Sequence, residues 1–423
     1  MANSADKTGL PIQQIAAITA GNALSFYDFV CYAFFATQIG ITFFPSHDRT
    51  TSLLASLATF GVGFFTRPLG GLIIGRMADR RGRKPAMVLS FALMGVGILG
   101  LALTPSYRSI GMAAPALFIL FRLVQGFALG GEVGPATTYL IEAAPPFRRG
   151  FYSSLSAATQ DFGVLIAGVV GTILAATLSP DALSSWGWRV AFLLGAAVIP
   201  FGLIVRRSLP ETLPEKTPQE PVPLAPFLRI AIFGLMMLLT ATVCNYAIEY
   251  MTTYANNTFR MDTTVAFGAT VVIGLFNVTF DLVSGWTSDR WGRKPVMIAP
   301  YVALIVLVFP AFWAIAHFRT TLALYAVSAL LASLQCWGSG PALTAITESL
   351  PRHIRAGALS VIYAVSIAAF GGTTQFMITW IIKETGNPLA PAWYMIGGIA
   401  IGLIAMFSIR ETAPIKVGVT EFQ

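Results

Sequence analysis

Charged residues are scarce in this chain of 423 residues. Asp, Glu, Lys and Arg make up only 11% of it, against about 25% in soluble globular proteins. Histidine and cysteine are scarcer still, with three residues of each. Cys31, Cys244 and Cys336 are odd in number and lie in apolar segments, so they predict neither a disulfide framework nor a metal site. The composition argues against a soluble enzyme and against a disulfide-rich secreted protein.

Motifs of ATP-driven and hydrolytic proteins are absent as well. The sequence contains no Gly-x-x-x-x-Gly-Lys-Ser/Thr phosphate loop, which argues against ATP as a source of energy. The three histidines are scattered near loops, and no Ser-His-Asp arrangement suits nucleophilic catalysis. We therefore predict no catalytic residues and no cofactor, and we do not expect an enzyme.

Long apolar runs, in contrast, recur along the whole length, and 55% of the residues are hydrophobic. About 20 apolar residues in a helix cross a hydrocarbon core of about 30 Å. The sequence thus predicts an all-α integral membrane protein. Its twelve spans are expected near residues 12–44, 51–76, 86–104, 112–143, 150–178, 187–207, 227–256, 264–288, 296–317, 321–349, 356–384 and 390–410.

The net charge of +8 does not indicate a nucleic-acid partner, because most Lys and Arg residues fall in loops on one side of the predicted spans. This distribution follows the positive-inside rule and places both termini in the cytoplasm. The first apolar run lacks a compact basic region and a cleavage site, so we expect a retained helix rather than a signal peptide. We predict a multi-pass protein of the inner membrane that contacts lipids and functions as a monomer.

One long polar stretch divides the chain. Residues 208–226 contain six prolines and four charged residues, a composition typical of a semi-rigid linker that buries no core. We expect an N-terminal six-helix bundle over residues 1–207 and a C-terminal bundle over 227–423. Two related bundles with a site between them are typical of carriers that work by alternating access.

A basic motif supports the relation between the two halves. Gly75–Pro85 returns as Gly285–Pro295, and both copies contain Asp-Arg-x-Gly-Arg-Lys-Pro between apolar runs. The aspartate can cap a helix end or pair with an arginine, which would make each loop a gate latch; the alternative is a role in topology alone. The candidate gating residues are Gly75, Asp79, Arg80, Gly82, Arg83, Gly285, Asp289, Arg290, Gly292 and Arg293.

Acidic residues inside the spans are costly and usually face the protein interior. They are candidate proton carriers, because binding and release of a substrate can be coupled to their protonation. Internal ion pairing is the alternative. These acids are Asp28, Glu132, Asp161, Glu249 and Asp281.

Arginines inside the spans are the best candidates to bind an anionic substrate, because a guanidinium group binds a carboxylate through two hydrogen bonds. Arg122 shares a helix face with Gln125, whereas Gly126 and Gly130 on its other side predict close helix packing. For Arg67, followed by Pro68, a structural contact is the alternative.

Further polar and aromatic residues complete the predicted cavity, although aromatic residues in spans belong to the core more often than to a site. Gly371-Gly372 is expected to be a hinge or a point of close packing. The remaining substrate-site candidates are Asn22, Tyr27, Tyr32, Gln160, Asn245, Tyr246, Asn277, Trp337 and Gln375.

The basic motif resembles the loops between helices 2 and 3 and between helices 8 and 9 of major facilitator superfamily carriers. Gly21–Phe29, Arg67–Gly70, Arg122–Phe127 and Gly130–Glu132 resemble stretches of its metabolite:proton symporter family. The resemblance implies twelve helices in two bundles and proton-driven import of a di- or tricarboxylate such as citrate.

Two departures from the family pattern leave the substrate open. Ser25 stands where the family usually has Glu, and Asp161, Glu249 and Asp281 add acids that a trianion would not favour. The alternatives are a zwitterionic, amine or metal-chelate solute, similar to betaine, proline or a siderophore. A drug exporter is disfavoured, because Asp161–Gly168 lacks the Gly-Pro-rich motif of such proteins.

Overall fold

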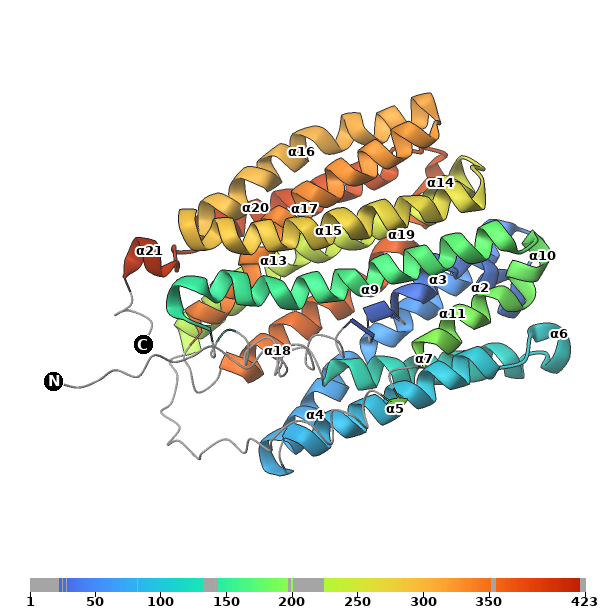
Figure 1. The fold of residues 1–423 in the computed structure, drawn as a ribbon, viewed down its shortest axis with the longest axis horizontal. Helices are drawn as coiled ribbons and strands as arrows, with labels where there is room; N and C mark the ends of the chain where they lie inside the picture. The colour runs from blue at the N-terminus through green and yellow to red at the C-terminus, as the bar shows by residue number, and fades with distance from the viewer. Residues whose placement is uncertain are drawn as a thin grey trace.

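The computed structural model describes residues 23–24, 26–27, 29–81, 83–131, 141, 144–196, 199–200, 224–350 and 355–418. This part of the chain is helical and contains no strand. Nine of the described helices are long and apolar enough to cross a membrane. Each falls in a predicted span, so the expected all-α membrane architecture is confirmed (Figure 1).

The N-terminal half, as described, covers residues 23–200 and begins with a helical segment that leads into α2. Its longest helix is α9, and its elements are α2 (Ala36–Phe43), α3 (Arg49–Phe65), α4 (Arg67–Arg81), α5 (Arg83–Leu103), α6 (Tyr107–Ile110), α7 (Ala113–Gly130), η1 (Pro146–Arg148), α9 (Arg149–Thr177), α10 (Pro180–Ala182), η2 (Leu183–Gly187) and α11 (Trp188–Gly195).

The C-terminal half, as described, covers residues 224–350 and 355–418. Its elements are α13 (Leu224–Glu249), α14 (Met251–Thr258), α15 (Thr263–Trp291), α16 (Arg293–Phe318), α17 (Thr321–Ser349), α18 (Arg355–Ser366), η3 (Ile367–Gly371), α19 (Gly372–Thr385), α20 (Ala390–Ser408) and α21 (Pro414–Val417).

Local sequence explains where several helices begin and end. Asp48 caps α3 by accepting hydrogen bonds from the backbone of Thr50 and Thr51, and Asp262 caps α15 in the same way through Thr264. The predicted span 51–76 is divided at Thr66 into α3 and α4, where Pro68 removes a backbone donor. Between α15 and α16 only Gly292 intervenes, at φ +102°, a conformation that glycine adopts readily.

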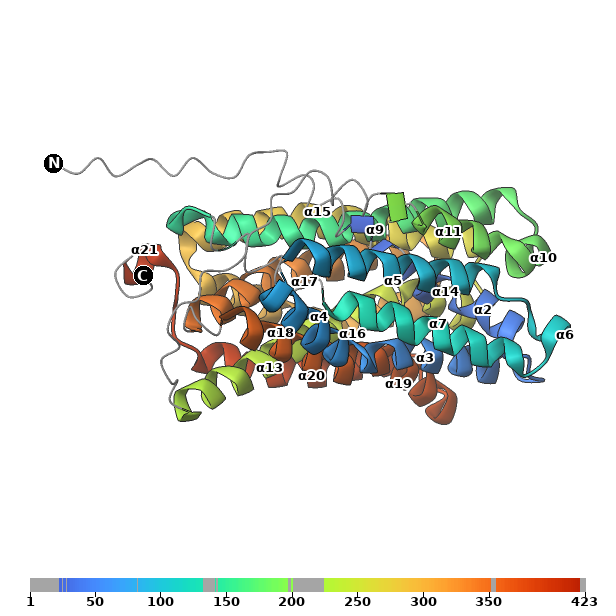
Figure 2. The same ribbon diagram turned by 90° about the horizontal axis from the view of Figure 1, so that it is seen from below.

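The two halves meet along two pairs of antiparallel helices. α9 and α15 lie side by side over their length (Figures 1 and 2), with Gly168 against Thr270 near one end and Gly285 against Ser154 near the other. α3 and α19 approach so closely that a Cβ at Gly61 would overlap the carbonyl oxygen of Gly372. The prediction of close packing at Gly371-Gly372 is therefore confirmed, and small residues set the distance between the halves.

Apolar side chains fill each half and also cover its outside. One buried cluster, with Phe60 and Phe118, consists mainly of N-terminal residues, and a second, with Met297 and Tyr301, consists mainly of C-terminal residues; each also includes residues of the other half. Many large apolar side chains on the outer faces are exposed, as expected of helices that face lipid.

Candidate functional site

A cavity of about 140 Å³ lies where helices of both halves meet. One part of its wall is formed by α9 together with the helical segment that precedes α2. The other part is formed by α13, α17, α18 and η3. Two acids from different halves, Asp161 and Glu249, share this wall, and none of its described lining residues is Arg, Lys or His. Its polar lining consists of Ser153, Gln160, Asp161, Thr242, Asn245, Tyr246, Glu249, Gln335, Ser339 and Tyr363.

Glu249 lies at the C-terminal end of α13 and is only 4% exposed. Its Oε1 accepts a hydrogen bond of 2.8 Å from Asn245 Nδ2, one helical turn earlier, whereas its Oε2 has no described partner. The i, i+4 pair predicted from the sequence is thus formed. It holds the carboxyl group against the cavity and leaves one oxygen for a proton or a ligand.

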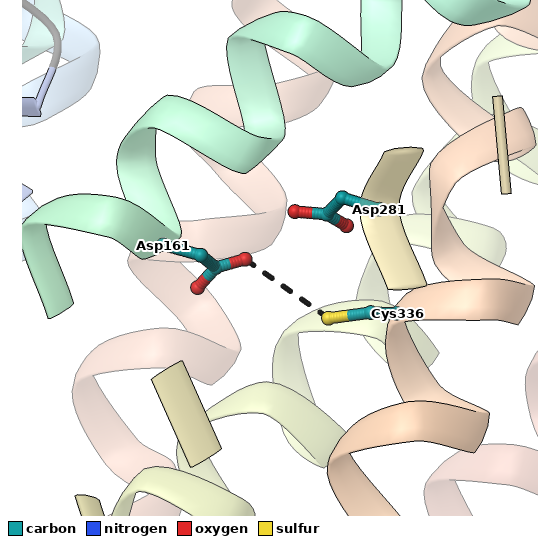
Figure 3. A group of neighbouring side chains, drawn as sticks. All are labelled: Asp161, Asp281 and Cys336. Atoms are coloured by element: carbon teal, nitrogen blue, oxygen red, sulfur yellow. Dashed lines mark hydrogen bonds between the residues drawn. The ribbon is translucent and has the colours of Figure 1, made fainter. Parts of the chain in front are cut away.

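Asp161 of α9 faces Asp281 of α15, which is 2% exposed, across the boundary between the halves (Figure 3). Asp161 Oδ1 accepts a hydrogen bond of 3.0 Å from Asn277 Nδ2, and the Cys336 thiol lies 4.0 Å from Asp161 Oδ2. Ligand atoms of Asp161, Asp281 and Cys336 lie within 4.8 Å of one another. A buried acidic cluster therefore adjoins the cavity, which Asp161 itself lines.

These acids have no cationic partners in the part of the chain that the structure describes. The ion pairs there join Arg293 to Asp289 and Glu348, and Lys383 to Asp48. Asp161, Glu249 and Asp281 take part in none of them. Internal ion pairing, the alternative explanation for the extra acids, therefore finds no support among the described residues.

Arg67 is 3% exposed and lies at the start of α4, where Thr66 separates this helix from α3. Its guanidinium carbon lies 4.3 Å from the Phe29 ring centre and 4.4 Å from that of Phe64. Its Nε and Nη2 have no hydrogen-bond partner among the described residues. Phe64 also contacts Tyr246, a cavity residue, so Arg67 lies one aromatic layer behind the wall.

Arg122 and Gln125 do not line the cavity formed by the described residues. Arg122 donates a hydrogen bond to Gln125, and its guanidinium group lies over the rings of Phe29, Tyr32 and Phe60, at 4.2–4.9 Å. Both residues are fully buried. An anion would reach Arg122 only after movement of these aromatic side chains.

The small residues beside Arg122 pack as predicted. A Cβ at Gly126 would overlap the carbonyl oxygen of Gly63, and one at Gly130 would overlap that of Arg67. α7 therefore packs against α3 and α4 through backbone contacts, which fixes Arg122 near Arg67 and the aromatic cluster of Phe29.

Other predicted site residues make structural contacts. Tyr27 donates to the carbonyl of Ala191 (2.8 Å) and Tyr32 to that of Ser56 (3.1 Å). Trp337 donates to Thr287 Oγ1, and Gln375 donates to the carbonyl of Tyr246. Of the predicted polar and aromatic residues, Gln160, Asn245 and Tyr246 line the cavity, whereas Tyr27, Tyr32, Asn277, Trp337 and Gln375 do not.

The second basic loop joins the two halves at one end of the molecule. Asp289 at the end of α15 accepts hydrogen bonds of 2.9 Å from the backbone N–H groups of Gly150 and Phe151 in the first turn of α9. Arg293 pairs with Asp289 (2.7 Å) and with Glu348 (3.2 Å). An aspartate of one half thus caps a helix of the other, which is one of the two contacts expected for a latch.

The neighbouring motif residues hold this loop in shape. Arg290 lies over the Trp286 ring at 4.1 Å, and Gly292 forms the turn into α16. Glu411, after α20, accepts hydrogen bonds from the backbone N–H groups of Arg293 and Lys294 at the start of α16. Helix capping from the C-terminal segment thus stabilises the start of α16.

Polar contacts also join the halves at the opposite end. Lys383 of α19 pairs with Asp48 at 3.0 Å, and Asn257 donates to Thr37 Oγ1 at 2.9 Å. Hydrogen bonds from Thr51 and Lys383 hold the pKa of Asp48 well below its usual value. The cavity therefore lies between two sets of contacts that link the halves.

Comparison with known proteins identifies the architecture. The family model of the Major Facilitator Superfamily matches residues 18–366, which is more than half of the chain. This chain belongs to the major facilitator superfamily. Its twelve helices form two six-helix bundles, of which nine spans lie in the described residues. It is accordingly a multi-pass membrane protein and a transporter.

Sequence similarity to known transporters covers nearly the whole length of this facilitator. It is 33% identical to a citrate-proton symporter of Klebsiella pneumoniae, with 94% of this chain and 91% of that protein covered. It is 33% identical to a proline/betaine transporter of Escherichia coli K12, with 95% and 84% covered. The structure superimposes on the partially occluded, inward-open xylose transporter XylE of E. coli with a TM-score of 0.77, covering 94% and 97% of the chains at 16% identity.

Some predicted residues of the facilitator cannot be placed. Asn22, Asp28 and Glu132 lie outside the described residues. The same is true of Gly82, of the surroundings of Gly75 and of the side chains of Asp79, Arg80 and Arg83 in the first basic loop. Their roles stay predictions.

The structure also adds residues that the sequence analysis did not select. Thr242, Gln335, Ser339 and Tyr363 line the cavity, and Cys336 joins the acidic cluster. The polar residues within Gln335–Gly340, inside an apolar helix, were the available signal for two of them, Gln335 and Ser339. Cys336 gave no such signal, since a cysteine in a span is usually an apolar core residue.

Proposed function

We propose that this facilitator is a proton-coupled symporter that imports a small carboxylate-bearing metabolite by alternating access. The observation that carries the proposal is the position of Asp161 and Glu249. They come from different halves and line one cavity between them. Any movement that opens this cavity to one side of the membrane changes the surroundings of both acids together.

Proton coupling is supported by the burial of these groups. A buried carboxylate without a cationic partner is costly, so each acid is stabilised by a bound proton. Exposure to water on either side lets the proton exchange. Asp161, Glu249 and Asp281 are therefore the proposed coupling residues among the described acids, together with the predicted Asp28 and Glu132.

A carboxylate substrate is supported by Arg67 and by the relatives. A buried guanidinium group with two nitrogen atoms that have no partner among the described residues is suited to a carboxylate, and Arg67 lies over Phe64, which contacts the cavity residue Tyr246. The Klebsiella relative is named a citrate-proton symporter. Arg122, with Gln125, is proposed as a second anion contact after rearrangement of the aromatic cluster.

A zwitterionic substrate is the second candidate, and one observation favours it. The described cavity wall has two acids and no basic residue, a charge balance that suits a solute with a positive group as well as a carboxylate. The E. coli K12 relative is named a proline/betaine transporter.

The contacts at the two ends are proposed to be the gates. The Asp289 capping contact closes the end that holds the basic loops, and Asp48–Lys383 closes the other. We place the basic-loop end and both termini in the cytoplasm on the basis of the positive-inside rule. The bundles are proposed to be residues 1–207 and 227–423, joined by the segment 208–226, whose last three residues already belong to α13, in a monomer surrounded by lipid.

Uptake into proteoliposomes tests the proposal. Labelled citrate, oxoglutarate, betaine and proline are offered with and without an inward proton gradient. We expect gradient-dependent accumulation of a carboxylate, and we expect Glu249→Gln to abolish accumulation while counterflow exchange continues. Glu384→Gln, the same change at an exposed position near the end of α19, is the matched control. Uptake at the same rate with and without the proton gradient would exclude symport. Accumulation of betaine but of no carboxylate would favour the zwitterionic substrate.

A further inference from the structure

Three side chains from three helices converge beside the cavity. Asp161 comes from α9 of the N-terminal half, whereas Asp281 of α15 and Cys336 of α17 come from the C-terminal half. One carboxylate oxygen of each acid and the thiol sulfur lie within 4.8 Å of one another. In Figure 3 both carboxyl groups and the sulfur point into the same space. The cluster therefore bridges the two halves at mid-length of α9 and α15.

Several oxygen atoms of this cluster have no described hydrogen-bond donor or cation beside them. Asp281 Oδ2 and Asn277 Oδ1 are buried and have no described partner, although these residues are only 2% and 1% exposed. The described hydrogen-bond donors at the cluster are the Asn277 side-chain amide, which donates to Asp161, and the Cys336 thiol. The thiol also lies 3.0 Å from Gln335 Oε1. Among the described residues, oxygen acceptors thus outnumber hydrogen-bond donors around the cluster. Buried acceptors are normally paired, so their excess indicates a missing cation.

We propose that Asp161, Asp281 and Cys336 bind a divalent transition-metal ion of the Zn²⁺ type between the two halves. In the tetrahedral geometry of Zn²⁺, Zn–S and Zn–O distances of about 2.3 and 2.0–2.2 Å place neighbouring ligand atoms about 3.4–3.6 Å apart. The Cys336 Sγ–Asp161 Oδ2 distance of 4.0 Å exceeds this value by a few tenths of an ångström. The other ligand atoms lie within 4.8 Å of one another and would approach by about 1 Å through rotation of the Asp161 and Asp281 side chains.

The donor set selects the metal. Carboxylate oxygens alone suit Mg²⁺, Ca²⁺ and Mn²⁺, whereas a thiolate favours Zn²⁺ and similar ions. The thiol releases its proton on binding, because the thiolate is the ligand. The side-chain oxygen of Asn277 provides a fourth metal ligand after the amide group rotates by half a turn. This rotation exchanges the positions of the amide nitrogen and oxygen atoms, which are similar in shape. A single proton would bridge the carboxyl pair but would leave Asn277 Oδ1 unpaired.

The position of the site gives it an effect on the proposed transport cycle. Asp161 lines the cavity, so an ion can reach the cluster through it. A metal ion bound to both α9 and α15 opposes the separation of the halves that alternating access requires. This consequence rests on the proposed function, whereas the binding itself does not. Zn²⁺ should therefore inhibit uptake.

Metal binding is tested first, on the full-length protein in lipid nanodiscs. Co²⁺ is titrated while the absorption band of a thiolate–Co²⁺ bond is recorded, and Zn²⁺ is then added as a competitor. We expect one Co²⁺ per chain, loss of the band on Zn²⁺ addition, and no competition by Mg²⁺ or Ca²⁺. Cys336→Ser should abolish the band, and Asp281→Asn should weaken binding at least tenfold.

Matched variants control for general damage. Cys244→Ser changes another fully buried cysteine, and Asp262→Asn changes the capping residue at the outer end of the same helix as Asp281. Both should leave the Co²⁺ band unchanged. Absence of the band in folded wild-type protein would overturn the proposal, and so would a band that persists in Cys336→Ser.

Transport then separates the two proposals. In wild-type proteoliposomes, Zn²⁺ at concentrations that displace Co²⁺ should reduce proton-driven uptake at least tenfold. Cys336→Ser should retain uptake and lose the inhibition. Proton-driven uptake that resists Zn²⁺, without a Co²⁺ band, would refute the metal site and leave the symporter proposal standing. A Co²⁺ band without any proton-driven uptake would do the reverse.

Discussion

The capping contact of Asp289 gives the most specific prediction about gating. Asp289 belongs to the C-terminal half, but it accepts hydrogen bonds from Gly150 and Phe151 in the first turn of α9, in the N-terminal half. Its ion pair with Arg293 lies within the C-terminal half. Only the two backbone hydrogen bonds therefore change when the halves separate, and Asp289→Asn weakens them with little change of shape.

The magnitude follows from these two bonds. An asparagine offers one acceptor oxygen instead of two and carries no charge at the helix N-terminus. A hydrogen bond to a charged group contributes about 1.5–3 kcal/mol, and a charge at a helix N-terminus about 0.3–1 kcal/mol. The closed state should lose about 2–3 kcal/mol relative to the open one. At about 1.4 kcal/mol per factor of ten, the open population rises about 30- to 140-fold.

Cysteine accessibility measures this population. Ser153 lines the cavity near the same end of α9, and Ser153→Cys in a background without the three native cysteines provides one reactive thiol. With a membrane-impermeant maleimide on the basic-loop side, Asp289→Asn should raise the labelling rate in proportion to the open population. Asp262→Asn, the cap at the other end of α15, should not. Equal labelling in Asp289→Asn and wild type would refute the latch.

Three further predictions follow from other contacts. The depressed pKa of Asp48 means that its pairing with Lys383 is complete above the usual carboxyl pKa and is lost only as the pH falls through the lower, folded value. Asp48→Asn should therefore lower the melting temperature equally at pH 8 and pH 5; a difference that vanishes by pH 5 would contradict this. Arg67→Gln removes the proposed carboxylate contact and should raise the KM for the substrate about 10- to 150-fold. Arg229→Gln, near the start of α13, should leave the KM unchanged, and an unchanged KM in Arg67→Gln would reassign Arg67 to packing. Gly61→Val inserts a side chain against the Gly372 carbonyl and should reduce transport at least tenfold with normal membrane insertion, while the same change at Gly397, which has open space around it, should have little effect; full activity of Gly61→Val would show that the halves do not pack closely there during transport.

The membrane fold was predictable from the sequence because it depends on local properties. Apolar runs of sufficient length define the spans, and the repeated Asp-Arg-x-Gly-Arg-Lys-Pro motif marks the two halves. Pairs one helical turn apart, such as Asn245 and Glu249, were also predictable, since helix geometry alone brings them together. The identity of Glu249 as a cavity residue followed from the cost of burying an unpaired acid.

Contacts between distant segments were not predictable in this way. Asp161 meets Asp281 only because small residues such as Gly168 and Gly285 fix the register of α9 against α15. A helical wheel of either segment gives no such register. Arg122 shows a second limit: its helix face is polar in the sequence, but Phe29, Tyr32 and Phe60 cover it in space. The partners of a buried cation depend on neighbouring helices as much as on its own.

Two residues that follow α20, Glu411 and Thr412, complete the network around Arg293. Glu411 binds the backbone of Arg293 and Lys294, and Thr412 donates to Glu348, the carboxylate that Arg293 also contacts. The ribosome adds these two residues more than one hundred positions after Arg293. A nascent facilitator therefore carries an incomplete network at this gate until the segment after α20 has been synthesised and has bound to the start of α16.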